Sequence, residues 1–504
     1  MLACVATFAI DGVDSREVTV EVDVRRGLPT FTVVGLPDRA IRESRERVRA
    51  ALMNSGLDFP QKRLTVNLAP AYLRKTGASF DLAIAVALLA ASGQVPREGL
   101  EGCAVSGELS LSGELRPTRG ALATAGGARR AGYERLIVPE DSACEAALLA
   151  ELEVIAVPSL TRLADLFHHR WRTVPASPLA PKPAAPGPDL ADVRGQEDAK
   201  RALEIAAAGG HNLLMIGPPG AGKTMLARRL PAILPPPTID EALEITQIGG
   251  VAGTGGSALA TQRPFRAPHH TVSPQGLVGG GTYPRPGEVT LAHRGVLFLD
   301  ELPEFSRSAL DALRQPLEEG SVEVTRGQHS VSFPAGFTMV AACNSCPCGR
   351  SAGGCDCTAL ALGRYARRLS GPLLDRVDLV CRVEALPAAR LVEPHGAEAE
   401  PSSTVRRRVV AARERQRDRL LATGALCNAD MDAACTRRLV RLDGALAARL
   451  VAASERVTLS GRGFDRVLRV ARTIADLDGR GRVTADDLDE ALGYRISALD
   501  LLAA

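Results

Sequence analysis

The sequence predicts a multidomain α/β protein, and three observations support this prediction. A short apolar run, Leu213–Ile216, passes directly into a glycine-rich turn, as a buried parallel strand does before a helix. A second apolar run, Val296–Leu299, ends in two carboxylates. A proline-rich stretch at 176–188 has little to pack and indicates a linker. The expected parts are an α+β domain, this linker, a parallel α/β core and an all-helical region, at 1–175, 176–188, 189–395 and 396–504.

The composition is that of an ordinary globular chain. Of 504 residues, 45% are hydrophobic and 24% are charged, and the net charge of +3 means that any nucleic-acid surface must be local. The longest strongly apolar run, Leu82–Ala91, is about half the length of a membrane-spanning helix. Residues 1–11 lack the basic segment of a signal peptide, so we expect none, and five of the eleven cysteines fall within Cys343–Cys357. We therefore expect a cytoplasmic protein without a membrane partner.

The N-terminal region alternates strands and helices without a regular βαβ repeat. Residues 17–24 alternate apolar and charged side chains, as a half-exposed strand does, and 39–53 has apolar residues at helical spacing. Further strands are expected at 31–34, 64–68, 108–111 and 136–138, with a largely buried helix at 81–91 and an Ala-rich helix between the last two strands. This order predicts an α+β domain.

Two segments of this region, Lys75–Asp81 and Ser106–Pro117, resemble the proteolytic domain of Lon-type proteases. In those enzymes a Lys activates a nucleophilic Ser by removing its proton. Ser79 matches the position of the Ser, but Thr124 stands where the Lys is expected. We therefore expect a Lon-protease-like fold without peptidase activity, and we interpret Ser79 as the N-cap of the helix at 81–91.

The central motif follows the first apolar run and fits the pattern G-x-x-x-x-G-K-[ST] at every fixed position. Its glycines let backbone N–H groups surround phosphates, and the next helix presents its N-terminus to the same anion. Lys223 would reach the β- and γ-phosphates of ATP, and the Thr224 hydroxyl would hold Mg²⁺. A plain glycine- and proline-rich turn is the alternative. The residues assigned to ATP are Gly217, Pro218, Pro219, Gly220, Ala221, Gly222, Lys223 and Thr224.

Two carboxylates, Asp300 and Glu301, end the second apolar run, at the strand end where open α/β sheets bind ligands. Asp300 would complete the Mg²⁺ shell, and Glu301 would polarise the attacking water. The pattern is common by itself, and a solvated strand end is the alternative. Downstream of a phosphate motif, it predicts hydrolysis of ATP rather than binding alone.

Two further positions resemble AAA+ ATPases. The turn at Gly195 and Gln196 precedes the phosphate motif, where that family lines its adenine pocket. Asn344 follows an apolar run at 337–342, which we expect to be a strand beside the one that ends at Asp300. This matches the AAA+ residue that holds the lytic water.

Arginines supply the remaining catalytic candidates by the same resemblance. Arg376 lies in Ser370–Asp378, which resembles the segment with the arginine finger, a residue that acts on the ATP of a neighbouring subunit. A local ion pair with a neighbouring aspartate is the alternative. In the helical region, which matches the AAA+ lid, Arg462 is assigned to the γ-phosphate, with Arg466 one turn later as the alternative.

The lid is expected to contain helices at 404–421, 439–451, 463–477 and 484–493. The first carries seven arginines, which indicate a solvated face or, as the second choice, a stripe facing DNA or another subunit. Thr484 and the acidic residues after it are typical of a helix start.

Two insertions distinguish the core. Residues 248–288 are Gly-rich and contain Arg266 and the pair His269–His270. No Cys, Asp or Glu is close to this pair, so we expect a basic loop facing a pore rather than a metal site. Residues 321–334 are expected to form a β-hairpin with Arg326 near its tip, as in chelatase and replicative-helicase relatives. Arg326 and Arg266 are the candidate contacts to DNA phosphates, and an ordinary surface hairpin is the alternative.

A cluster of cysteines forms a second candidate site. Cys346, Cys348, Cys355 and Cys357 make two C-x-C pairs in a glycine-rich loop, with Cys343 just upstream. Converging thiolates suit tetrahedral Zn²⁺, which would brace the loop near the ATP site or the pore. The spacing is tighter than in the usual C-x₂-C pairs, and free thiols or a redox role are the alternatives.

These segments together resemble the ComM/YifB group of magnesium-chelatase-like AAA+ proteins over essentially the whole chain. The resemblance implies a homohexameric ATPase with ATP and Mg²⁺ as cofactors. It also implies branch migration of single-stranded or branched DNA in recombination and natural transformation. The rival interpretations are a chelatase-type chaperone that remodels a partner and, more remotely, an active Lon-like protease. Further segments that carry the resemblance are Gly35–Asp38, Val66–Pro70, Arg263–His270, Cys346–Gly349 and Val470–Leu477.

Overall fold

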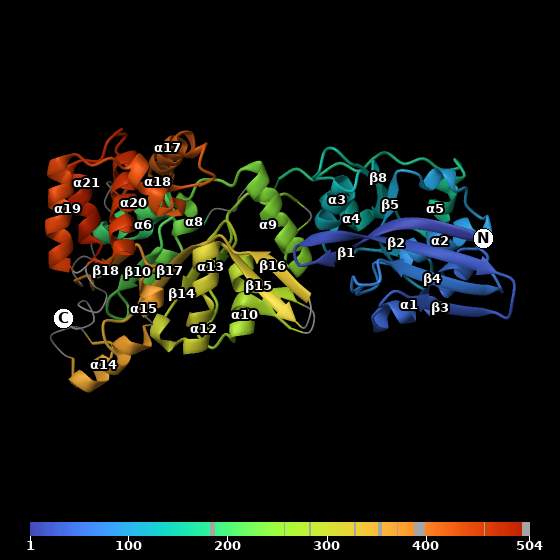
Figure 1. Ribbon diagram of the computed structural model, residues 1–504, viewed down its shortest axis with the longest axis horizontal. Coiled ribbons are helices and arrows are strands. Elements are labelled where there is room, and N and C mark those ends of the chain that lie inside the picture. Colours follow the sequence, from blue (N-terminus) through green and yellow to red (C-terminus); the bar gives the residue numbers. More distant parts are fainter. Residues whose placement is uncertain are drawn as a thin grey trace. The chain divides into compact units, whose positions relative to one another are not determined.

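The computed structural model consists of two compact units (Figure 1). The first unit is Met1–Pro183 with Ile239–Thr261, and the second is Ala184–Thr238 with Gln262–Ala504. The domain boundaries predicted from the sequence stay predictions. The structure describes residues 1–181, 187–256, 258–281, 284–326, 329–350, 355–369, 371–387, 399–457 and 459–495.

A seven-stranded mixed sheet forms the centre of the first unit, in the order β3-β4-β2-β1-β5-β8-β9. β2 runs antiparallel to both β1 and β4, whereas the other neighbours are parallel. No strand was predicted at β1, because its alanines leave little alternation and five consecutive residues are buried. The strands are β1 (Leu2–Asp11), β2 (Asp14–Arg25), β3 (Thr30–Val34), β4 (Arg63–Ala69), β5 (Cys103–Val105), β8 (Arg135–Pro139) and β9 (Glu153–Val157), with the small pair β6 (Glu108–Leu109) and β7 (Leu115–Arg116).

Helices and two hydrophobic clusters cover this sheet. One cluster joins α1 and α2 to the valines of β2, and the other joins α3 and α4 to Phe8. Every residue of Asp81–Ala91 is buried, which is why α2 is apolar all round. The helices are α1 (Arg39–Asn54), α2 (Asp81–Ser92), α3 (Ala121–Arg130), α4 (Glu140–Ala146), α5 (Leu160–Phe167), α9 (Ile239–Ala252) and the short η1 (Glu98–Leu100).

The helix α9 belongs to this first unit although its sequence lies beyond the phosphate motif. Gln247 on α9 donates a 2.7 Å hydrogen bond to the carbonyl of Val13, and α9 contacts α3. The predicted single insertion at 248–288 is therefore divided between the two units, because its first part belongs to α9 and the residues after it, and α9 packs on α3.

The start of α2 differs from the prediction for Ser79. The N-cap position is Phe80, and no side chain caps the helix there, so the interpretation of Ser79 as the N-cap is wrong. The Ser79 carbonyl instead accepts the N–H of Gly107 at 3.1 Å. Thr124, which stands where the resemblance to Lon-type proteases places the catalytic Lys, is buried in α3.

A buried lysine holds together two of the segments that carry the family resemblance, Gly35–Asp38 and Val66–Pro70. The ammonium of Lys75, which is fully buried, donates to the carbonyls of Gly35 (3.1 Å) and Pro70. Burial lowers the pKa of Lys75. The two loops are thus joined through one side chain, which is a structural role.

A five-stranded parallel sheet forms the centre of the second unit, in the order β11-β14-β17-β10-β18. Alternate residues of each strand enter hydrophobic clusters on the two faces, so both faces are covered. Because all strands are parallel, their carboxyl ends meet at one edge, and β17 lies between β10 and β14 there. The strands are β10 (Leu213–Ile216), β11 (Phe265–Arg266), β14 (Val296–Leu299), β17 (Thr338–Cys343) and β18 (Leu379–Arg382).

Short helices and two hairpins surround this sheet. The predicted hairpin at 321–334 is confirmed, with its tip, 327–328, outside the described residues. The hairpins are β12 (Gly279–Gly280) with β13 (Arg285–Pro286), and β15 (Ser321–Arg326) with β16 (His329–Pro334). The helices are α6 (Glu197–Gly209), α7 (Lys223–Ala227), α8 (Leu230–Ile233), α10 (Pro274–Val278), α11 (Glu288–Leu291), α12 (Arg307–Ala312), α13 (Arg314–Glu319), α14 (Ala359–Arg368) and α15 (Gly371–Leu374), with η2 (Leu190–Asp192) and η3 (Leu302–Glu304).

The helical C-terminal region packs on α6 through α17 and the largely buried α20. The capping box at Thr484 confirms the predicted start of α21, whereas the single helix predicted at 439–451 is wrong, because two helices with a break share that stretch. None of the described helices is long and apolar enough to span a membrane. The elements are α17 (Ser402–Leu420), η4 (Asn428–Asp430), α18 (Ala433–Leu439), α19 (Gly444–Val457), α20 (Gly461–Leu477) and α21 (Ala485–Gly493).

Arginines of α17 bond within the unit. Arg413 donates to the carbonyl of Ala207 on α6 at 3.0 Å, and Arg419 pairs with the buried carboxylate of Asp476 on α20 at 2.6 Å. Arg408 pairs with Glu204 at 2.5 Å. These side chains fasten the helices to one another, so neither the solvated face nor the DNA stripe describes the helix as a whole.

Candidate nucleotide-binding site

The phosphate loop between β10 and α7 is shaped by its glycines. Gly220 and Gly222 have φ angles of +76° and +94°, which residues with a Cβ rarely adopt. At Gly217 a Cβ would lie 2.0 Å from the carbonyl oxygen of Val383 on the neighbouring strand end. Only glycine therefore fits these positions, and the loop retains the open backbone cradle that phosphate oxygens require.

Lys223 begins α7 and turns its ammonium into this loop. Its Nζ donates to the carbonyls of Gly217 (2.7 Å) and Pro218 (2.8 Å) and to Oδ1 of Asn344 (3.1 Å). Burial lowers the pKa of Lys223, against the opposing effect of nearby acidic groups that include Asp300. The ammonium is thus held where an anion bound in the loop would meet it.

Thr224 and Asp300 bring the two halves of the motif together. The Thr224 hydroxyl donates a 2.7 Å hydrogen bond to Oδ2 of Asp300, which follows β14 directly. Oδ1 of the same carboxylate accepts the N–H of Glu301 at 3.0 Å. A hydroxyl and a carboxylate at this separation are the oxygen ligands that Mg²⁺ takes beside nucleotide phosphates, so the residues fit that ion.

Asn344 stands between these two halves, as the strand order requires. It follows β17, the strand between β10 and β14, and its amide oxygen faces Lys223. Its carbonyl accepts the hydroxyl of Tyr365 on α14 at 3.1 Å, which fixes the loop after the strand. The predicted placement of Asn344 on a strand beside the Asp300 strand is confirmed.

Gln196 joins the preceding turn to the phosphate loop. Its Nε2 donates to the carbonyls of Ala221 (3.3 Å) and Glu384 (2.6 Å). Gly195 beside it has a φ of +54°, and a Cβ there would lie 2.9 Å from Leu386. The structure therefore places this turn against the candidate nucleotide loop.

Arg266 does not lie in an open loop. It ends the edge strand β11, which pairs with β14, and its guanidinium makes two hydrogen bonds to Glu288 at 2.7 and 2.8 Å. Sheet pairing and an ion pair hold this residue, and the expectation that it faces a pore stays a prediction. The side chain of Arg326, the other DNA candidate, lies outside what the structure describes.

The histidine pair has an acidic neighbour that the sequence analysis missed. Nδ1 of His270 lies 3.6 Å from Oε2 of Glu301, so the expectation that no acidic group is close is wrong. The two residues are distant in sequence, and their proximity follows from the pairing of β11 with β14. The sequence could have indicated this proximity only through β11, because the histidine pair comes just after that strand. A strand of two residues has no recognisable pattern, so β11 could not be predicted.

Arg376 and Arg462 converge on one carboxylate, that of Glu318 at the end of α13. Arg376 pairs with Oε1 of Glu318, and Arg462 on α20 lies 3.5 Å from the same oxygen. The pairing with Glu318 is an ion pair that the sequence did not suggest, and no motif marks Glu318. Arg462 is well exposed, whereas the side chain of Arg376 is only 11% exposed.

Arg466, the alternative to Arg462, is occupied elsewhere. Its Nε lies 3.2 Å from Oδ1 of Asp378, and both side chains are about one-tenth exposed. Burial alone would raise the pKa of Asp378, but His211 and Arg466 outweigh it and hold that pKa below its usual value. The pair fastens α20 to the sheet, and Arg462 is the arginine of the two that remains at the surface.

The four cysteines of the loop after Asn344 converge. The sulfur atoms of Cys346, Cys348, Cys355 and Cys357 all lie within 4.8 Å of one another. Tetrahedral zinc with ordinary Zn–S bonds needs sulfurs roughly 3.8 Å apart, and the Cys348–Cys355 separation is 3.7 Å. The backbone at Arg350, with the Cys346 thiol, lowers the pKa of Cys348 to about 6, which favours a thiolate. The residues therefore fit a zinc ion.

This loop also packs on the phosphate loop. Gly349, in the middle of the cysteine loop, has a φ of +72°, and a Cβ there would lie 2.7 Å from Cγ of Pro219. The two candidate sites are thus in contact through Gly349 and Pro219. Cys343, buried at the end of β17, stands apart from the four, and burial raises the pKa of its thiol to about 12.

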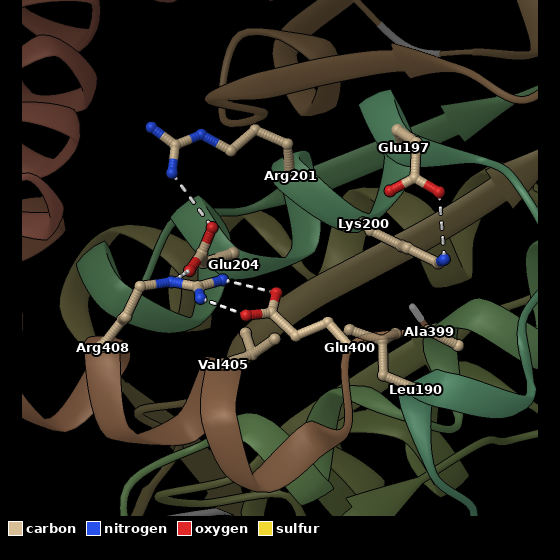
Figure 2. Close-up of a pocket in the computed structure, with 9 residues that line it drawn as sticks. All are labelled: Leu190, Glu197, Lys200, Arg201, Glu204, Ala399, Glu400, Val405 and Arg408. Carbon is tan, nitrogen blue, oxygen red and sulfur yellow. Dashed lines mark hydrogen bonds and ion pairs between the residues drawn. The ribbon is translucent and has the colours of Figure 1, made fainter. Parts of the chain in front are cut away.

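A charged cavity of about 340 Å³ lies between α6 and α17 (Figure 2). Its polar groups already pair with one another: Lys200 with Glu197 at 3.2 Å, and Arg408 with Glu400. Phosphate-loop residues do not line it, so it forms no part of the cradle described above. Its lining is Leu190, Glu197, Lys200, Arg201, Glu204, Ala399, Glu400, Val405 and Arg408.

The parallel sheet, the glycine-rich cradle and the Thr224–Asp300 pair define a P-loop ATPase domain. Residues 189–391 match the family described as magnesium chelatase, subunit ChlI. Residues 20–142 match subunit ChlI of Mg-chelatase, and 399–495 match the magnesium chelatase subunit ChlI C-terminal family. The central domain is therefore an AAA+ ATPase domain of the magnesium-chelatase type.

Relatives that match nearly the whole chain identify the family within this class of ATPases. The chain is 44% identical over 505 residues to the uncharacterized protein YifB of Salmonella typhimurium, covering 99% of this chain and 98% of that protein. It is 43% identical over 501 residues to competence protein ComM of Haemophilus influenzae, covering 98% and 97%. The chain belongs to the YifB/ComM family of magnesium-chelatase-like proteins. A shorter match, 30% identical over 232 residues, covers 42% of this chain and 51% of the Holliday junction branch migration complex subunit RuvB of Prochlorococcus marinus.

Proposed function

We propose that this protein is an ATP-driven homohexameric helicase that moves along single-stranded or branched DNA. The observation that carries ATP hydrolysis is the meeting of Lys223, Thr224, Asp300 and Asn344 at one sheet edge. The DNA substrate is supported by two relatives, one named a competence protein and the other a branch migration subunit. Recombination and natural transformation are the processes that this activity would serve, in the cytoplasm.

Each residue of the site has a defined part in this proposal. The backbone at Gly217–Thr224 and the Lys223 ammonium would hold the phosphates of ATP, and Thr224 with Asp300 would hold Mg²⁺. When bound, the ion neutralises the charge that develops on the transferred phosphoryl group. Glu301 would accept a proton from the attacking water, and Asn344 would orient that water. Gly195 and Gln196 would close the adenine end of the site.

The proposed ring follows from the two arginines at Glu318. Arg376 and Arg462 meet at the carboxylate of Glu318, and Arg462 is well exposed. We propose that both guanidinium groups serve the nucleotide of a neighbouring subunit, where they would stabilise the charge of the transition state. Glu318 would release them when the neighbour presents its phosphates. A closed ring would complete every site, and six is the number of subunits that the resemblance to hexameric AAA+ motors implies.

Zinc at Cys346, Cys348, Cys355 and Cys357 is the second part of the proposal. The ion would cross-link a loop that touches Pro219 through Gly349 and adjoins Asn344. Its role would be structural, because four thiolates complete its coordination and leave no open position for a substrate.

The first unit is proposed to be a Lon-protease-like domain without peptidase activity. Thr124 has no basic nitrogen to activate Ser79, and it is buried. A peptidase activity that is lost in Ser79→Ala would overturn this part.

The deciding experiment measures ATP hydrolysis by the full-length protein, alone and with a single-stranded oligonucleotide or a four-way DNA junction. We expect stimulation by DNA, ATP-dependent branch migration, and loss of both activities in Lys223→Ala. Robust ATP hydrolysis without DNA stimulation or strand movement would instead favour a chelatase-type remodelling chaperone. Native mass spectrometry with ATP tests the hexamer, and a stable monomer under those conditions would contradict the ring.

A further inference from the structure

Four exposed basic residues meet at one end of the sheet of the first unit. β2 ends at Arg25 and β4 begins at Arg63, and their antiparallel register places these two residues directly opposite each other. Because Arg26 follows β2 and Lys62 precedes β4, both lie at the same end. The chain after Arg26 crosses this end, since a Cβ at Gly27 would lie 3.7 Å from Cβ of Arg63. We name these exposed residues the basic cluster: Arg25, Arg26, Lys62 and Arg63.

The basic cluster holds more positive charge than its ion pairs neutralise. Like charges that face each other across two strands cost stability, as Arg25 and Arg63 do. Asp23 pairs with Arg25 at 2.5 Å. Within the part of the chain that the structure describes, the side chains of Arg26, Lys62 and Arg63 form no ion pair. A local excess of this kind, in a chain whose net charge is +3, indicates a surface for an anionic partner.

Two aromatic rings border the basic cluster. Phe31 of β3 pairs in register with Leu64, the residue after Arg63. Its ring stacks on that of Phe59, with centres 6.2 Å apart, and the guanidinium of the exposed Arg49 lies 5.9 Å from the centre of the Phe59 ring. Proteins that bind single-stranded nucleic acids combine cations that follow the backbone with rings that can stack on bases. This end of the sheet therefore has the chemistry of such a surface.

The other candidate contacts to DNA phosphates do not show an available cation. The guanidinium of Arg266 donates two hydrogen bonds to Glu288, and the side chain of Arg326 lies outside the described residues. Because the net charge is small, a DNA surface must be local, and the basic cluster meets that requirement.

An anionic membrane is the other partner that exposed cations suit. Leu28, which is 86% exposed, lies beside the basic cluster in the connection from β2 to β3. Binding to a membrane surface needs a broad apolar face, which one leucine does not supply. Phe31 and Phe59 are half-buried against each other and add little to such a face. The observations therefore favour a nucleic acid.

We propose that the basic cluster binds the phosphodiester backbone of single-stranded DNA, so that the first unit has a DNA site of its own. This inference rests on the DNA substrate proposed above, and it gives the Lon-protease-like domain a role in place of peptidase activity. Arginine and lysine side chains contact phosphate oxygens without reading the sequence, so the binding is independent of sequence and weakens with salt. ATP takes no part in this contact, which can be measured without nucleotide.

The test measures binding of a fluorescent single-stranded thymidine oligonucleotide to the full-length protein, by anisotropy and without ATP, between about 50 and 200 mM salt. The cluster variant combines Arg26→Ala, Lys62→Ala and Arg63→Ala, and we expect its Kd at the lower salt to rise about 10- to 100-fold. The slope of log Kd against log salt should fall by about 2, because each lost contact to a single strand removes about 0.7. The melting temperature checks that the variant is folded.

A second triple variant controls for the loss of charge. Arg129→Ala, Arg130→Ala and Arg162→Ala together remove three exposed arginines from α3 and α5 of the same unit. This control should bind the oligonucleotide within about twofold of wild type, because distant charges are screened by salt. An equal loss of affinity in the two triple variants would overturn the inference. So would a folded cluster variant whose affinity and salt slope match those of wild type.

Two further outcomes identify which proposal fails. Wild-type protein that binds no oligonucleotide would overturn the proposed DNA substrate and this inference together, whereas DNA binding that the cluster variant retains overturns the inference alone. Sedimentation with vesicles of phosphatidylglycerol and phosphatidylcholine tests the membrane. Vesicle binding that requires the basic cluster, without binding of the oligonucleotide to it, would assign this surface to a membrane instead.

Discussion

Arg466 and Asp378 form a buried ion pair that joins the helical region to the parallel sheet. Their atoms lie 3.2 Å apart, and Asp378 also accepts the N–H of Asn212 at 3.0 Å and faces His211 at 3.7 Å. Because Asn212 in turn donates to the carbonyl of Arg376, the pair supports the backbone beside the proposed arginine finger.

Removing Arg466 should mainly destabilise the second unit. Arg466→Ala leaves the Asp378 carboxylate buried with one fewer partner, and we expect a loss of about 3 kcal/mol in unfolding free energy. Circular dichroism measures this, and the unfolding of the first unit can be separated by the fluorescence of Trp171, the only tryptophan. An unchanged melting temperature with loss of ATP hydrolysis would instead make Arg466 the arginine that acts on the nucleotide.

Removing Arg462 should lower ATP turnover and leave the stability of the protein nearly unchanged. The side chain is 69% exposed and its contact to Glu318 is 3.5 Å long, so Arg462→Ala should cost less than about 1 kcal/mol of stability. If it reaches the γ-phosphate, kcat for ATP should fall about 10- to 100-fold. Arg437→Ala, another exposed arginine of the lid with a long contact, is the matched control. Mixing Arg462→Ala with Lys223→Ala subunits tests action across the interface, since activity should reappear only if the residues serve different subunits' sites.

The sequence predicted those residues of the candidate site that belong to a continuous motif or directly follow an apolar run. Asp300 and Asn344 each stand directly after a recognisable strand, and Lys223 and Thr224 end the glycine-rich motif that follows a third strand, so local pattern and parallel pairing together bring them to one edge. The contact of His270 with Glu301 depends on an edge strand of two residues, which carries no periodicity.

Two other features that the sequence did not predict also depend on contacts between residues far apart in the chain. Glu318 gains its importance only because α13 and α20 bring it between two arginines. The grouping of Ile239–Thr261 with the first unit depends on the packing of α9 against α3, which lies far upstream in the sequence. Long-range contacts of this kind leave no periodic mark, whereas the glycines of the phosphate loop are dictated by their own backbone.

Loss of the zinc ligands should lower the metal content and raise KM for ATP. Cys346→Ser combined with Cys348→Ser removes two of four ligands, and we expect the bound zinc to fall from about one per chain to below one-tenth. Because the loop rests on Pro219, KM for ATP should rise several-fold. Elemental analysis and steady-state kinetics measure both effects. Cys144→Ser in the first unit is the control, and equal zinc in the double variant and wild type would remove the metal from the proposal.

The contact between Gly349 and Pro219 can be tested without touching a cysteine. In Gly349→Ala the new Cβ meets Pro219 at 2.7 Å, and the φ of +72° is unfavourable for alanine. The phosphate loop or the cysteine loop must then shift, so we expect weaker binding of a fluorescent ATP analogue with zinc content retained. Gly363→Ala, where a Cβ meets nothing within 4 Å, is the control. Unaltered affinity in Gly349→Ala would show that the two loops move independently.

The buried Asp81 should give the first unit a distinctive pH dependence. Burial raises its pKa to about 6 despite the hydrogen bonds from Arg47 at 2.7 and 3.0 Å. An unfolded aspartate titrates near 3.9, so between about pH 4 and 6 the native state binds more protons than the unfolded state. Stability from this group is therefore complete below about pH 4 and is lost as pH rises to about 6.

The free-energy difference between wild type and Asp81→Asn isolates this contribution, because other carboxylates titrate alike in both proteins. We expect wild type to lose about 2 to 3 kcal/mol relative to the variant between pH 4 and pH 7, measured by urea unfolding with Trp171 fluorescence. Glu43→Gln, at an exposed carboxylate that pairs with Arg39, should show no such trend. A difference that is constant with pH would mean that Arg47 compensates the burial of Asp81 in full, and that the carboxylate is ionised throughout this range.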